Sequence, residues 1–191
     1  MQVVVAEYFR VFRQGFLEPD GSRVSKLDFL RLFMAPDLAT GTVFGFEALA
    51  RNWGIVGLLF DDVRFKLDHV ERATEISIVA KTTTSFTISR QSIVDVCRDE
   101  DFSDSPAQRT RWTRIAAVLL EERLTMRGTV QFTWDNSAKR MIGLVSQLDM
   151  ISSLLKLLGN VEDISIIFSS ACLSLEGNIL KDYAARYPLF C

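Results

Sequence analysis

Histidine is almost missing from this 191-residue sequence, in which His69 is the only one, and cysteine occurs three times. With one imidazole, any histidine-based metal site or Ser-His-Asp triad must include His69. Three scattered cysteines are too few for a disulfide framework or a zinc site, which favours a reducing intracellular compartment. We therefore expect no metal and no cofactor.

Long hydrophobic runs and known catalytic motifs are also absent. The longest apolar runs, GIVGLLF and IAAVLL, are far below the ~20 residues that a membrane helix requires. Neither a dinucleotide-binding glycine motif, a P-loop, H-E-x-x-H nor G-x-S-x-G occurs. The formal net charge of −2 argues against a broad surface for nucleic acid or anionic lipid. We expect no membrane partner.

Arginines do gather in one stretch, QRTRWTR, where Arg109, Arg111 and Arg114 surround Trp112. An aromatic side chain among arginines is compatible with a nucleic-acid contact. Because the stretch follows an acidic segment in a slightly acidic chain, we instead expect a solvated helix face or local ion pairs.

The spacing of apolar residues predicts six helices, at residues 2–16, 26–35, 43–59, 106–122, 150–158 and 161–173. Trp53 lies on the apolar stripe of the third helix. Asp149 and Asn160 are the expected N-caps of the last two helices.

Strict alternation of apolar and polar residues predicts four strands, at residues 60–70, 75–89, 124–134 and 140–149. In the second strand, Thr82 and Thr84 share the inner face with isoleucines, which is mild evidence for a polar cavity or for hydroxyls that bond to a neighbouring backbone. Helices and strands form blocks instead of alternating regularly. This order favours an α+β fold with a mainly antiparallel sheet.

His69 is the most informative candidate in the first strand. The alternation places it on the inward face, after Val63, Phe65 and Leu67. A half-buried, hydrogen-bonded structural histidine is one hypothesis, and a base or ligand contact at a pocket is the other. We favour the structural role first, a ligand contact second and catalysis third.

The outward face of the strand at 124–134 has a mixed polar composition. It carries Arg127, Thr129, Gln131 and Thr133, a surface suited to a modest, reversible interface. We therefore expect a homodimer that uses these residues.

The order of elements over about residues 3–173 resembles the nuclear-transport-factor-2-like superfamily, which includes SnoaL-like cyclases and ketosteroid isomerase. The segments FMAPDL, FDDVRFKLDHVER, TTTSFTISRQSI, RLTMRGTVQFTWD, QLDMISSLLKLLGNVEDIS and FSSACLSLEGNI resemble, more specifically, the C-terminal domain of oomycete bZIP-type transcription factors. The basic region and the leucine heptads of such factors have no counterpart here. We therefore expect no direct DNA binding by this chain.

The resemblance implies a cone-shaped fold, in which a curved, mainly antiparallel sheet of about four to six strands wraps around N-terminal helices. A single domain would span residues 1–174, followed by a tail at 175–191. The pocket candidates in such a cone are Tyr8, Trp53, His69, Thr82 and Thr84.

The function stays open between three hypotheses. The favoured one is a non-catalytic regulatory module that self-associates and binds a small apolar ligand, located in the nucleus by resemblance and otherwise in the cytoplasm. The second is a SnoaL-like or ketosteroid-isomerase-like enzyme for a hydrophobic carbonyl or polycyclic substrate, with His69 as candidate base. The third is a filled cone without a pocket. A cavity above ~300 Å³ with convergent polar groups would favour the first two hypotheses.

Overall fold

A five-stranded sheet forms the centre of the computed structural model, with strand order β1-β5-β4-β3-β2. The structure describes residues 1–16, 23–41, 43–96 and 106–170, so the predicted domain boundary at 174/175 lies outside the described residues. The strands are Met34–Ala39 (β1), Asp61–Arg72 (β2), Ser77–Thr87 (β3), Arg123–Asp135 (β4) and Arg140–Leu148 (β5). Neighbouring strands from β2 to β5 are antiparallel, and β1 is parallel to β5.

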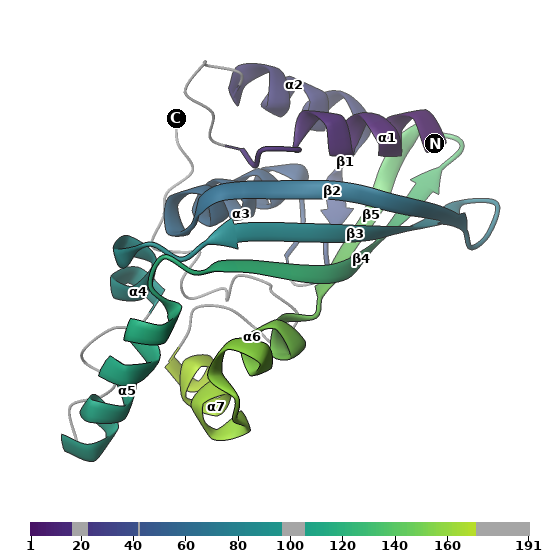
Figure 1. Ribbon diagram of the computed structural model, residues 1–191. Coiled ribbons are helices and arrows are strands. Elements are labelled where there is room, and N and C mark those ends of the chain that lie inside the picture. Colours follow the sequence, from purple (N-terminus) through teal and green to yellow (C-terminus); the bar gives the residue numbers. More distant parts are fainter. Residues whose placement is uncertain (17–22, 42, 97–105, 171–191) are drawn as a thin grey trace.

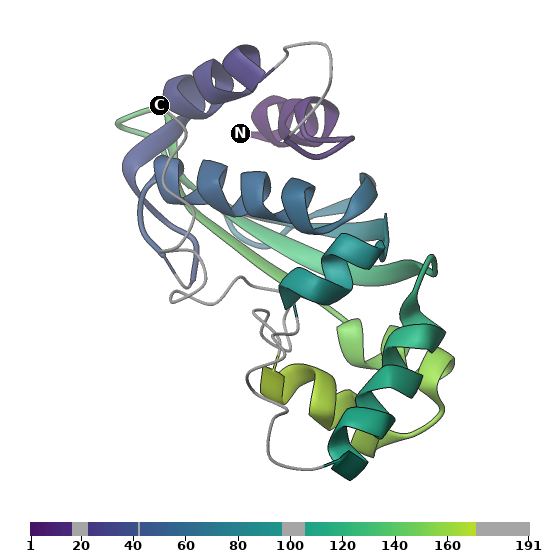
Figure 2. The ribbon, with the colours of Figure 1, turned by 90° about the vertical axis from the view of Figure 1, so that its left-hand side faces the viewer.

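The helices of the described residues are Gln2–Val11 (α1), Arg23–Phe33 (α2), Phe46–Leu59 (α3), Arg90–Val96 (α4), Pro106–Leu119 (α5), Met150–Leu158 (α6) and Val161–Ser170 (α7). In Figure 1 the sheet curves across the molecule without closing, and Figure 2 shows α3 lying along one of its faces. In both views α5, α6 and α7 gather at the opposite end from α1 and α2. The predicted α+β class is confirmed, and the five strands fall within the four to six that the resemblance implied, one more than the four predicted from alternation.

The structure contains two elements that the sequence did not predict. β1 follows α2 directly, and its exposed Pro36 and Asp37 interrupt the alternation that would announce a strand. A proline is tolerated there because β1 is an edge strand. α4 begins just after Ser89, whose backbone N–H donates to Ser92 Oγ at 2.9 Å, while the Ser92 N–H donates to Ser89 Oγ at 3.2 Å. This reciprocal cap starts the helix with serine in the place usually held by glutamate.

Two hydrophobic cores lie on the inner side of the sheet. The N-terminal core joins α1, α2 and α3 to the sheet, and its fully buried members include Tyr8, Phe12 and Phe132. The C-terminal core joins the end of α3 to α5, α6 and α7 through residues such as Ile115. Trp53 packs against both cores, so α3 is the element that connects them.

A bulge in β2 overturns the predicted position of His69. The pairing with β3 shifts between Leu67 and His69, which leaves Asp68 as an extra residue in the strand. The extra residue reverses the alternation, so Val70 packs against the N-terminal core while His69 faces solvent. The predicted inward orientation is wrong, because 62% of the His69 side chain is exposed and its Nε2 lies 3.7 Å from a Glu71 carboxylate oxygen.

Both ends of α6 and the start of α7 form as predicted, while the predicted end of α7 at residue 173 lies outside the described residues. The Asp149 side chain accepts a hydrogen bond from the Ser152 N–H at 3.0 Å, and the Asn160 side chain accepts one from the Asp163 N–H at 2.8 Å. Gly159 ends α6 with a φ of +74°, a conformation that costs little only for glycine.

Asp163 also connects α7 to the arginine-rich helix α5. Its carboxylate, 3% exposed, accepts hydrogen bonds from Arg111 Nε at 2.5 Å and from Arg114 Nη2 at 2.7 Å. Burial raises the pKa of Asp163, but the bonds from Asn160 and Arg111 and the charges of both arginines outweigh this effect and lower it. Arg111 and Arg114 therefore make the expected local ion pairs.

Candidate functional site

The strongest candidate for a site is a cavity of about 130 Å³, whose walls come from α1, α3, the inner faces of β2 to β5, the residue after β1 and the start of α6. It is lined by Tyr8, Thr40, Leu49, Asn52, Trp53, Val56, Phe60, Val63, Phe65, Thr84, Phe86, Val130, Leu144, Ser146, Leu148 and Met150. This volume falls below the ~300 Å³ that would have favoured the ligand-binding and enzyme hypotheses.

Local sequence patterns bring these residues to the cavity. On α3, Leu49, Trp53 and Val56 are spaced by four and three residues, which places them on one face of the helix. On β5, the alternation of the strand places Leu144 and Ser146 on the inner face.

A hydrogen bond between Tyr8 and Trp53 crosses one wall of the cavity. The Trp53 indole Nε1–H donates to the Tyr8 hydroxyl oxygen at 2.8 Å. Tyr8 is 1% exposed, and burial raises its pKa above the ordinary value, although the bond from Trp53 acts in the opposite direction. The phenol is therefore protonated at physiological pH and able to donate a hydrogen bond.

Two buried threonine hydroxyls on β3 have no hydrogen-bond partner among the described residues. They belong to Thr84, which lines the cavity and is 7% exposed, and to Thr82, which is 2% exposed. Most buried hydroxyls in proteins are paired, so two unpaired ones on a single strand are unusual.

The cavity wall carries no carboxylate, imidazole, ammonium, guanidinium or thiol among the described residues that line it. Its polar side-chain groups are hydroxyls, the Asn52 amide and the Trp53 indole N–H. Tyr8, the ionisable group in this set, is held in its neutral form. The wall can therefore bind neutral polar groups, whereas a proton-transfer reaction would lack a base there.

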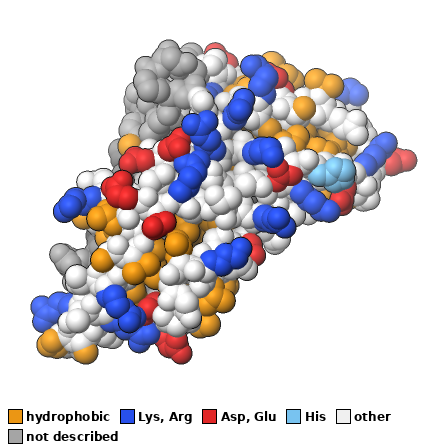
Figure 3. Space-filling view, in the orientation of Figure 1, with side chains coloured by type: hydrophobic (Ala, Val, Ile, Leu, Met, Phe, Trp, Pro, Cys, Tyr) orange, Lys and Arg blue, Asp and Glu red, His pale blue; other side chains and the backbone are white. Residues whose placement is uncertain are grey.

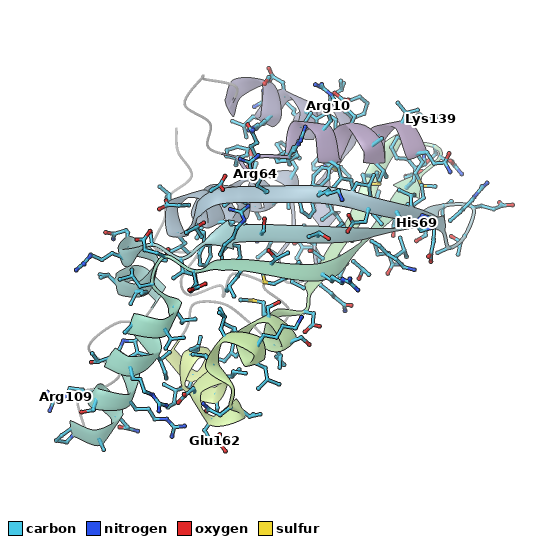
Figure 4. The ribbon with its side chains drawn as sticks, viewed as in Figure 1. Arg10, Arg64, His69, Arg109, Lys139 and Glu162 are labelled. Carbon is cyan, nitrogen blue, oxygen red and sulfur yellow. The ribbon has the colours of Figure 1, made fainter. Side chains whose placement is uncertain are left out.

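The predicted pocket candidates take different positions. Tyr8, Trp53 and Thr84 line the cavity together. Thr82 lies on the same inner face of β3 but is not part of the wall. His69 lies on the outer face of the sheet. Figure 4 shows it along β2 from Arg64, toward the other end of the strand.

Sequence reasoning missed three polar residues of the wall, Thr40, Asn52 and Ser146. Ser146 was available from the alternation in RMIGLVSQLD, which places it between Leu144 and Leu148 on the inner face. Asn52 is next to Trp53 in the sequence, at the border of the α3 face that lines the cavity. Thr40 follows the unpredicted strand β1, so no pattern pointed to it.

The outer face of the sheet holds the predicted interface residues and divides into two parts. Thr129, Gln131 and Thr133 lie with Val79 and Val145 on one part of this face, and we call these five residues the uncharged patch. Charged residues border it, since Lys81 lies opposite Thr129 and Glu71 opposite Val79. Val145 is 38% exposed.

The other part of the outer face is rich in ion pairs. Asp62 contacts Arg64 at 3.0 Å and Arg123 at 2.5 Å, and the hydrogen bond from Arg123 is the main cause of its lowered pKa. Arg127 pairs with Thr83 of β3 in this part of the sheet. Figure 3 shows Lys and Arg side chains spread over this face.

Membrane and metal signatures are absent from the part of the chain that the structure describes. No helix there is long and apolar enough to cross a membrane. Nor do three or more His, Cys, Asp or Glu side chains of the described residues come together in a way that could hold a metal ion.

Comparison with known proteins identifies the architecture. Residues 3–58 match the model of the bZIP transcription factor 1 C-terminal domain. Similar solved structures include TsrD from Streptomyces laurentii, with 14% identity, a TM-score of 0.52 and coverage of 83% of this chain and 97% of that one. A SnoaL-like polyketide cyclase from Agrobacterium tumefaciens has 14% identity, a TM-score of 0.54 and the same coverages. This chain has the nuclear-transport-factor-2-like fold.

As expected, residues 3–58 resemble the C-terminal domain of bZIP transcription factor 1. A nuclear-transport-factor-2-like protein from Burkholderia thailandensis is also similar, with 14% identity, a TM-score of 0.50 and coverage of 82% of this chain and 95% of that one. The search of the curated proteins found no match. At such identities, the structural likeness concerns the fold alone.

Proposed function

We propose that the domain is a non-catalytic regulatory module of a nuclear, bZIP-type transcription regulator, which binds a small ligand in the cavity and self-associates. The match of residues 3–58 supports the link to bZIP proteins. The observation that carries the non-catalytic role is the composition of the cavity wall, which combines apolar side chains with neutral polar groups and lacks a base among the described residues.

An enzyme that acts on a hydrophobic carbonyl or polycyclic substrate is the second candidate. The similar polyketide cyclase favours it, and so does the protonated Tyr8 hydroxyl, which could donate to a substrate carbonyl. However, proton abstraction requires a positioned base within hydrogen-bond reach. His69, which we considered for that role, faces solvent on the opposite side of the sheet. A volume of about 130 Å³ is also small for several fused rings.

Access to the cavity can be tested with ethylbenzene, an apolar single-ring compound. We expect ethylbenzene to raise the melting temperature of the 191-residue chain, because a ligand that binds only the folded state stabilises it. Val56→Phe, which places a larger side chain at the wall, should abolish this rise. Val145→Phe makes the same change on the outer face and should preserve it. No response in the unmodified protein would contradict ligand binding.

Catalysis can be tested separately with acetophenone in deuterated buffer. A proton-abstracting enzyme would accelerate deuterium incorporation at the methyl group next to the carbonyl, which NMR detects. We expect the protein to leave the rate of deuterium incorporation equal to the rate in buffer alone. Acceleration that disappears in Tyr8→Phe would favour the enzyme over the regulatory module.

Self-association through the uncharged patch is supported by its exposed Val145 and by its polar, uncharged members Thr129, Gln131 and Thr133. In a two-fold dimer a central residue faces the same patch of the second copy. Gln131→Arg would place like charges across such an interface and should weaken the dimer roughly tenfold or more. Thr125→Arg, on the same face but outside the patch, is the control. Light scattering that shows a monomer at high micromolar concentration would contradict this part of the proposal.

A further inference from the structure

The unpaired hydroxyl of Thr84 indicates the chemistry of the ligand. Thr84 is 7% exposed, its Oγ1 has no partner among the described residues, and its side chain forms part of the cavity wall. A buried hydroxyl without a partner is costly, whereas one that faces a cavity can be paired by whatever enters.

The charge of the ligand follows from the rest of the wall. Because no charged side chain lines the cavity among the described residues, a charged ligand would lose its hydration without gaining a counter-charge. The polar groups available are neutral. The Tyr8 oxygen already accepts a bond from Trp53, which leaves its O–H free to donate.

The size of the ligand follows from the volume of about 130 Å³. Dry protein cavities of about 150 Å³ bind benzene. A single ring is therefore the expected scale, and a polycyclic compound is too large.

We propose that the cavity binds an uncharged single-ring compound whose polar group, a carbonyl or hydroxyl oxygen, forms a hydrogen bond with the Thr84 hydroxyl. This inference rests on the proposed function, because it names the ligand class of the same cavity. The apolar ring would contact Trp53, Val56 and Phe86, and the oxygen would satisfy the group that the empty domain leaves unpaired.

Acetophenone and ethylbenzene form a matched pair of probes that differ by the carbonyl oxygen, and benzoate is the charged counterpart. Dissociation constants are measured by calorimetry with the whole 191-residue chain, and the indole N–H resonance of Trp53 reports binding at the cavity. We expect both neutral probes to bind and benzoate not to bind.

Three variants separate the hydrogen bond from general packing. Thr84→Val should weaken acetophenone binding about tenfold, or 1.4 kcal/mol, because a hydrogen bond contributes on this scale. Ethylbenzene has no oxygen to accept this bond, so its binding should stay unchanged within about twofold. Thr84→Ser keeps the hydroxyl and should retain acetophenone binding. Thr82→Val removes an unpaired hydroxyl that does not line the wall and should affect neither probe.

Each alternative outcome has a distinct meaning. If Thr84→Val leaves acetophenone binding unchanged, or weakens both probes equally, the inference is wrong while the proposed function stands. Tight benzoate binding would overturn the neutral ligand class. If neither neutral probe binds the unmodified protein, the cavity does not admit ligands, and the ligand-binding part of the proposed function falls as well.

Discussion

Thr82→Val should stabilise the protein, although it removes a polar group. Thr82 lies on the inner face of β3, is 2% exposed, and its Oγ1 has no hydrogen-bond partner among the described residues. Burial of an unpaired hydroxyl costs about 1–3 kcal/mol by mutational comparison. Valine has nearly the same shape and is equally suited to a strand, so the substitution removes this cost without opening a large cavity.

The expected gain in the free energy of unfolding is therefore about 1–2 kcal/mol. In a chain of this size, each kcal/mol raises the melting temperature by about 2–4 °C. Circular dichroism during thermal and urea unfolding measures both quantities.

Thr83→Val is the matched control for Thr82→Val, one position along the same strand. Thr83 Oγ1 donates to Asp68 Oδ2 at 2.5 Å on the outer face, so its loss should lower stability slightly. If Thr82→Val is no more stable than the unmodified protein, Thr82 has a partner that the geometry does not show, and the reasoning fails.

Three further predictions concern the C-terminal helices and DNA. Asp163→Asn should lower the free energy of unfolding by about 1–3 kcal/mol at pH 7, since it weakens the bonds from Arg111 and Arg114. The fold lowers the pKa of Asp163, so the stability that this carboxylate contributes is present above ~3.9, the pKa of an unfolded aspartate, and is lost as the pH falls below that value. Acid unfolding of the two proteins measures this, and identical pH profiles would refute it. Asp149→Ala should cost about 1 kcal/mol in urea unfolding because it removes the N-cap of α6, and an unchanged midpoint would show that the cap contributes nothing. Titration of duplex DNA at low salt should show no sequence-selective binding by this chain, whose net charge is −2; selective binding would disprove this.

The sequence predicted best those elements that have one buried face and one exposed face. β3 and β4 have one face against the cores and one toward solvent, so their alternation was visible without a structure. β1 has no such signal, because Pro36 and Asp37 occupy its middle. The error at His69 has another cause, since a bulge is defined by pairing with a neighbouring strand, and one extra residue exchanges the faces beyond it.

The cavity was harder to predict than the strands because its groups come from distant parts of the chain. The Tyr8–Trp53 bond joins residues 45 positions apart, and Thr84 and Ser146 belong to β3 and β5. Alternation indicated that Thr84 faces inward, but not whether another group would fill the space in front of it. Whether that space is filled depends on the packing of side chains from other elements, and the pattern along one strand does not report this packing.

Thr84 links the stability of the empty domain to ligand binding. Its unpaired hydroxyl should destabilise the empty fold, as at Thr82, but a ligand that pairs it would recover that loss. A ligand at a concentration 100 times its dissociation constant stabilises a protein by about 2.7 kcal/mol. Thr84→Val should therefore melt at a higher temperature than the unmodified protein when empty and show a smaller rise with acetophenone at equal concentration. Thr82→Val should share only the first effect, because its hydroxyl does not line the cavity. Equal acetophenone-induced rises in the Thr84 variant and the unmodified protein would show that the Thr84 hydroxyl stays unpaired in the complex.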